Sequence, residues 1–233
     1  MRTLDEVRAL VGPGRAVRNG IFWEGVERCA RKLSPAELAE MVKGAGVMAG
    51  VAAQVALLTR GAVEDEARRL DVIDALVFAG KAQTQFEGVL GRLGRAGEVQ
   101  RRAAARGRGG RSDADSALEA ARIFMGAAER IDWRQLGVPA ADAPEDALAL
   151  LCAAYEWVTV ARGLGWAVCG VAGRLDERAA DALVVGVATL DRVRCSLLWT
   201  TAHGGCGARP GVKFHALPLV TRLGAAPVDG QAS

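Results

Sequence analysis

The sequence predicts an all-α protein, a helical bundle with a protruding arginine- and glycine-rich loop and an irregular C-terminal tail. About half of the 233 residues are apolar (51%) and 24% are charged, which is typical of a globular chain. Aromatic residues make up only 5% of the sequence, whereas alanine and leucine are abundant. Alanine and unbranched side chains favour helices, while sheets depend more on aromatic and β-branched residues. No long segment alternates between apolar and polar residues, as a strand would.

We expect one helical domain over residues 1–225, followed by a disordered tail at 226–233. The pattern leaves open a division into two helical halves, 1–106 and 113–201, joined by a glycine- and arginine-rich linker. We prefer the single helical body, from which the linker protrudes as a basic loop.

Local signals define the helices of the first half. Ser34-Pro35-Ala36-Glu37 combines an N-cap, a proline in the first turn and the glutamate of a capping box. This pattern predicts a helix from Pro35 to about Thr59. Two more helices are expected, at 63–79 and 82–93, with a break at Gly80. The first of these two carries Leu70, Ile73, Leu76 and Val77 on one apolar face.

The second half is expected to hold helices at about 114–131, 144–161, 166–171 and 176–201. The break between the second and third of these is assigned to Gly163-Leu164-Gly165, because glycine weakens a helix. A short strand is possible at 212–217. We expect Trp157 and Trp199 to lie in the core, and Trp133 to be exposed near a helix end.

The positive charge of the chain is concentrated in one segment, residues 92–111. The formal charge of the whole chain is +3, but this segment has seven arginines against one acid, Glu98, and so carries +6; the rest of the chain therefore carries −3. The arginines are Arg92, Arg95, Arg101, Arg102, Arg106, Arg108 and Arg111. A weaker basic cluster, interspersed with acids, lies nearer the start of the chain (Arg8, Arg15, Arg18, Arg28, Arg31 and Lys32).

This distribution favours binding to the phosphate backbone of a nucleic acid. Arginine guanidinium groups bind phosphate, and glycines allow a loop to follow a backbone. The segment lacks interleaved aromatic residues, so base stacking is not predicted. Two alternatives stay open: the arginines face an acidic protein, or they are solvated and bind nothing specific.

The sequence gives little support to a metal site or an enzyme. Cys195, His203, Cys206 and His215 could ligate zinc, but the spacing C-x7-H-x2-C-x8-H matches no common zinc finger. Catalysis by Cys206 with a histidine is the least favoured function. Phosphate-binding glycine loops are absent from the sequence as well. We therefore predict no metal, no cofactor and no catalytic residue.

Residues 44–58 form an uninterrupted, weakly polar stretch with Gln54 inside it, which raises the question of a membrane. Its roughly fifteen residues fall short of the ~20 that span a bilayer, so a buried helix is the preferred interpretation. The first ten residues include Asp5 and Glu6 where the apolar run of a signal peptide would begin. The five cysteines are odd in number and scattered, which is typical of a reducing compartment. We expect a cytoplasmic protein with no membrane contact.

The predicted helices together with the arginines of residues 92–111 give the chain a family resemblance. In these features it resembles the small helical subunits of multi-subunit CRISPR ribonucleoprotein complexes, which act in antiviral defence. The resemblance implies an all-α protein that lines the groove for the guide RNA and its target and contacts backbone rather than sequence. It also implies that Arg101, Arg102, Arg106 and Arg108 contact that backbone, and that the apolar helices pack against neighbouring copies.

Two functional hypotheses follow from the sequence. The first is a non-catalytic helical subunit of a nucleoprotein assembly, which binds RNA or single-stranded DNA through the arginines of residues 92–111. Its other partners would be protein subunits of the complex and copies of itself. The alternative is a helical scaffold or adaptor, or a phage-type structural protein, that binds proteins and has no nucleic-acid role.

Overall fold

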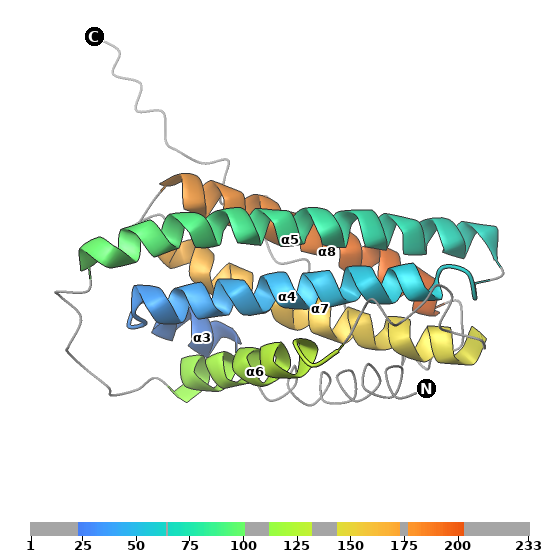
Figure 1. Ribbon diagram of the computed structural model, residues 1–233, viewed down its shortest axis with the longest axis horizontal. Helices are drawn as coiled ribbons and strands as arrows, with labels where there is room; N and C mark the ends of the chain where they lie inside the picture. The colour runs from blue at the N-terminus through green and yellow to red at the C-terminus, as the bar shows by residue number, and fades with distance from the viewer. Residues whose placement is uncertain (1–22, 64, 101–111, 132–143, 173–176, 203–233) are drawn as a thin grey trace, which may run out of the picture.

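The computed structural model describes residues 23–63, 65–100, 112–131, 144–172 and 177–202. Within these ranges the chain is helical and contains no strand, which confirms the predicted all-α bundle (Figure 1). The helices are α3 (Trp23–Ala30), α4 (Pro35–Thr59), α5 (Glu66–Gln100), α6 (Ser112–Ala128), α7 (Pro144–Ala172) and α8 (Glu177–Ala202).

The helices pack in three layers. Helix α4 packs against α5 and α7, and α8 completes a four-helix bundle by packing against the same two helices. Helix α6 lies on α4, and α3 lies against α6 and α7, so these two shorter helices cover the α4/α7 layer. The α5/α8 layer lies opposite (Figure 1), and none of the other described helices covers its outer face.

Helix α4 begins and ends where the local signals place it. The Ser34 backbone N–H donates a 2.7 Å hydrogen bond to Glu37 Oε2, and the Glu37 N–H donates a 3.3 Å bond to Ser34 Oγ. This is the expected capping box, with Pro35 at the first helical position. Most of the helix circumference is buried, because α5, α6 and α7 surround it.

Helix α5 is continuous from Glu66 to Gln100, so the predicted break at Gly80 is wrong. A glycine inside a helix costs about 1 kcal/mol relative to alanine. That local cost is outweighed by packing, because the helix buries Ala79, Ala82 and Phe86 around and beyond the glycine against its neighbours. The two helices expected at 63–79 and 82–93 are therefore one.

The face of α5 that packs inward differs from the expected one. The buried face carries Val72, Ala75 and Ala79, each at most 1% exposed. By contrast, Leu70, Ile73 and Val77 of the predicted apolar face are 60%, 38% and 46% exposed. Around Gly80 the small side chains of Ala75, Ala79 and Ala82 point inward and allow α5 to approach its neighbours closely. Leu70, Ile73 and Val77 are left outside, whereas larger residues further along the helix, such as Phe86, are buried.

Helix α7 is also continuous, so the break predicted at Gly163-Leu164-Gly165 is wrong. The two glycines instead make room for side chains from other helices. A Cβ at Gly163 would lie 2.6 Å from the ring of Trp23 in α3. A Cβ at Gly165 would lie 2.9 Å from Val187 Cγ2 and 3.1 Å from the Phe86 ring. Glycine serves close packing here rather than a turn.

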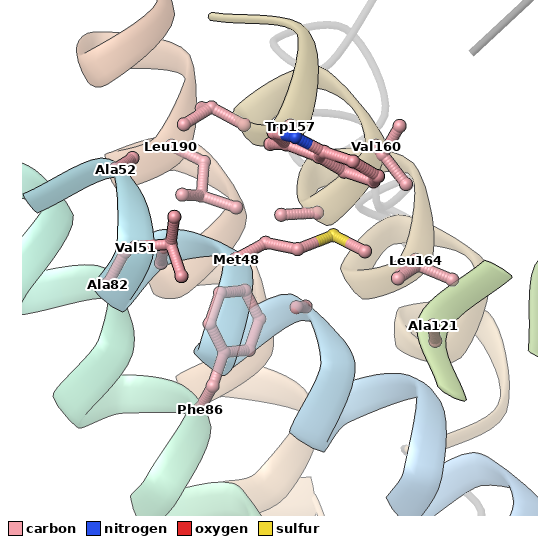
Figure 2. Packing of buried hydrophobic residues seen from close by; sticks show 14 of the residues in the cluster. Met48, Val51, Ala52, Ala82, Phe86, Ala121, Trp157, Val160, Leu164 and Leu190 are labelled. Atoms are coloured by element: carbon pink, nitrogen blue, oxygen red, sulfur yellow. The ribbon is translucent and has the colours of Figure 1, made fainter. Parts of the chain in front are cut away.

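Phe86 occupies the centre of the four-helix bundle and is fully buried (Figure 2). Three glycines, one from each of the other bundle helices, surround it. A Cβ at Gly46 of α4 would lie 3.3 Å from Phe86 Cβ, and one at Gly186 of α8 would lie 3.3 Å from Phe86 Cζ. Gly165 of α7 is the third. We call Gly46, Gly165 and Gly186 the glycine socket.

Two helices are long and apolar enough to cross a membrane by length and composition alone, α4 and the Ala147–Val171 part of α7. Both are mostly buried inside the bundle, and the core helices of water-soluble proteins show the same pattern. The prediction of no membrane contact therefore stays a prediction.

The tryptophans divide between core and surface. Trp157 is 3% exposed and packs on Phe124 with ring centroids 4.1 Å apart, which confirms its predicted core position. Trp199 is 59% exposed, so its predicted core position is wrong. It lies on the side of α8 opposite Leu183, Leu190 and Val193, which form the buried face. Trp133, the possible strand at 212–217 and the tail at 226–233 lie outside the described residues.

The glycine socket implies that alanine substitutions at two glycines of α7 have opposite effects on stability. Gly165→Ala should lower the free energy of unfolding by about 1 kcal/mol, because overpacking against the stiff Val187 side chain exceeds the gain in helix propensity. Gly170→Ala is the control, since an added Cβ there meets no heavy atom within 4 Å. It should raise the free energy of unfolding by up to about 1 kcal/mol. Urea unfolding followed by circular dichroism measures both, and equal effects would contradict the socket.

Candidate nucleic-acid interface

The structure places two of the seven predicted arginines. Arg92 lies near the C-terminal end of α5 and is half-buried, and Arg95 lies on the same helix one turn further on. The other five fall in residues 101–111, which lie outside the described residues. Helix α5 continues to Gln100, beyond residue 93 where the predicted helix ends.

The C-terminal end of α5 extends beyond the rest of the bundle. Helix α5 runs to Gln100, about two turns beyond the buried Leu93. Figure 1 shows this green end projecting past the adjacent ends of α4 and α8. The backbone of Arg95 therefore lies on a projecting part of the helix, and the basic segment starts at its tip.

Other basic residues share this end of the bundle. Helix α6 begins at Ser112 at the same end at which α5 ends (Figure 1), so residues 101–111 connect two helix ends that lie close to one side of the molecule. Arg31 and Lys32, from the weaker basic cluster, are exposed in the connection before α4 at that end. Arg178 is exposed in the first turn of α8, which also begins there. We call this end of the bundle the basic end.

The helix backbone also contributes some positive charge to the basic end. The N-termini of α4, α6 and α8 all lie at the basic end, and helix N-termini carry partial positive charge. Glu37 and Glu177 sit in the first turns of α4 and α8 and offset part of it. The positive potential of this end therefore depends mainly on the arginine side chains.

A polar cluster between α7 and α8 was not found by sequence reasoning. Arg162 is only 9% exposed, and its Nε donates a 2.5 Å hydrogen bond to Asp191 Oδ1. Arg194 donates to the same oxygen at 3.1 Å and to Thr159 Oγ1 at 3.2 Å. A guanidinium this buried needs such partners. The cluster fixes the position of α7 along α8. The signal in the sequence that could have predicted it was a single arginine, Arg162, within an otherwise apolar run.

Only one of the four proposed zinc ligands lies within the described residues. Cys195 is exposed on α8, whereas His203, Cys206 and His215 lie outside the ranges that the structure describes. Within those ranges, no three or more histidine, cysteine or acidic side chains are grouped to hold a metal ion. The catalytic alternative at Cys206 also falls outside them.

With the geometry of the basic end established, the chain was compared with known proteins. No family model, curated protein or solved structure matches it. The resemblance to CRISPR small subunits therefore stays a prediction. Function has to be inferred from the charges, contacts and exposed faces of this chain alone.

Two cysteines on neighbouring helices should differ in reactivity. Burial raises the pKa of the Cys169 thiol to about 12, so almost none of the reactive thiolate is present at pH 8. Cys195 is exposed. We expect iodoacetamide at pH 8 to modify Cys195 and spare Cys169 in the folded protein, as read by peptide mass spectrometry. In urea both should react; equal labelling of both in the folded protein would contradict the packing of α7.

Proposed function

We propose that this protein is a non-catalytic helical subunit of a cytoplasmic nucleoprotein assembly that binds the backbone of RNA or single-stranded DNA. The observation that carries the proposal is the projecting end of α5, which presents the start of a +6 segment at the basic end. The helix end that projects past α4 and α8 leaves room for a phosphate chain to approach the segment. Arg31, Lys32 and Arg178 are exposed at the same end, beside the exposed acid Glu177.

The chemistry of the segment indicates how it would bind. Guanidinium groups donate paired hydrogen bonds to phosphate oxygens and remain charged at any physiological pH. Phosphate contacts give affinity that depends on salt and not on base sequence. The segment contains no aromatic residue on which bases could stack, so we expect weak discrimination between sequences.

One observation favours protein partners as well. Five of the six exposed large apolar side chains lie on α5 and α8, namely Leu70, Ile73, Val77, Val185 and Trp199. Exposed apolar residues gathered on one side of a protein are typical of a protein-binding surface. A scaffold with no nucleic-acid role would need this face and not the basic end, which separates the two hypotheses.

Binding of a labelled 30-nucleotide RNA, measured by fluorescence anisotropy across salt concentrations, tests the proposal. If the seven arginines each neutralise one phosphate, the logarithm of the binding constant should fall with a slope of about −5 against the logarithm of salt. That slope corresponds to a loss of about 1,000-fold in affinity between 50 and 200 mM salt. Arg101→Glu with Arg102→Glu should weaken binding at least tenfold and reduce the slope by about 1.4.

The matched control reverses two arginines at the opposite end of the bundle. Arg60→Glu with Arg68→Glu changes the net charge equally, and both residues lie where α4 ends and α5 begins. This variant should keep near-wild-type affinity. Equal weakening by both double variants would show only non-specific attraction, and no binding at 20 mM salt would leave the scaffold as the better hypothesis.

A further inference from the structure

The outer face of α5 carries a stripe that the core does not use. Leu70, Ile73 and Val77 are spaced three and four residues apart, so they follow one line along the helix, and all three are exposed. The same line continues through Gly80, Thr84, Gly88 and Gly91. At 100° per residue these seven positions fall within roughly 80° of the helix circumference. We call them the α5 stripe.

The stripe is divided by residue size. Its first half has large apolar side chains, and its second half has three glycines and one threonine. A Cβ added at Gly80, Gly88 or Gly91 would meet no heavy atom within 4 Å, so the space above them is open. These glycines make no close contact within the described part of the chain, unlike those of the glycine socket.

Helix α8 widens this face at one end. The Arg192 side chain bonds to Asp74 at 3.5 Å and lies 5.4 Å from the centre of the Phe78 ring, which fixes the antiparallel alignment of α8 beside α5. Trp199 lies about two turns beyond Arg192 and is therefore level with Leu70. The exposed indole adds apolar surface beside the large half of the stripe.

We propose that the outer face of the α5/α8 layer binds a second copy of this chain across a two-fold axis, with α5 antiparallel to its counterpart. A two-fold contact requires a self-complementary surface. With the axis between Gly80 and Lys81, Leu70 lies opposite Gly91 of the second copy, Ile73 opposite Gly88, and Val77 opposite Thr84. Leu70 and Ile73 then each fill the open space above a glycine, and the two-fold axis repeats both contacts.

Charge supports the same alignment. Asp74, Lys81 and Arg92 lie along one edge of the stripe. In the antiparallel pair, Asp74 falls between Lys81 and Arg92 of the second copy, each offset by about five or six residues, or ~8 Å, along the axis. Asp74 is about half exposed and its carboxylate can accept further hydrogen bonds beside the one from Arg192. Opposite charges therefore alternate along this edge.

The face is large enough for a specific contact. From Leu70 to Gly91 the stripe runs about 30 Å, and two helices side by side are about 20 Å wide. Its projected area of roughly 600 Å² approaches the ~800 Å² of accessible surface that each partner buries in a standard interface. The inference rests on this face alone and is independent of nucleic-acid binding.

Sedimentation velocity from 1 to 100 μM tests the proposal, and the full chain should form dimers. Ile73→Asp and, separately, Gly88→Gln should each raise the dimer dissociation constant at least about 100-fold. Gly88→Gln is the sharper test, because it fills the open space without disturbing the fold and replaces a helix-weakening glycine. The variant should thus be monomeric and no less stable to urea.

Matched controls lie on α6, away from the face. Ile123→Asp replaces a side chain that is 64% exposed, and Gly126→Gln fills another glycine with no neighbour within 4 Å. Both should dimerise like the wild type. A wild type that stays monomeric at 100 μM, a dimer that survives Ile73→Asp and Gly88→Gln, or growth into open polymers would each overturn the two-fold contact.

Discussion

The structure depends on the insertion of one aromatic ring between three glycines. Phe86 is fully buried, and each of the other three helices of the bundle meets it with a glycine. The close approach permitted there sets the spacing of the whole bundle, since the alanines along α5 and α4 fit only when the helices lie close together. The smaller helices follow the same rule: α3 docks where the Trp23 ring covers Gly163, and α6 docks where Ala121 meets Gly44.

The sequence predicted those features that depend on neighbouring residues. The capping box at Ser34 and Glu37 is complete in itself, so the start of α4 could be located from four residues. The breaks assigned to Gly80 and to Gly163–Gly165 were wrong, because a glycine that ends a helix and one that admits a ring from another helix look alike in sequence. Apolar periodicity also failed on the first half of α5, because it identified Leu70, Ile73 and Val77, and the helix turns a different face toward the core there.

The candidate site was predictable only in part. A run of arginines is visible as composition, so Arg92 and Arg95 could be named in advance. Their position near the end of a helix that projects beyond the bundle could not be predicted, because it depends on how far α5 continues past Leu93. The bond between Arg162 and Asp191 joins residues 29 positions apart, and only the alignment of α7 with α8 brings them together. In the described residues, therefore, the basic end and the apolar α5/α8 face lie on different sides of one rigid body.

The glycine socket also constrains how this sequence can diverge. A methyl group added at Gly46, Gly165 or Gly186 would come within 3.3 Å of the Phe86 side chain, so these positions cannot drift independently of residue 86. In related chains we expect a smaller residue at position 86 wherever one of the glycines has become alanine. Distant relatives would therefore share a sparse set of covarying small residues and one large one, with little overall identity.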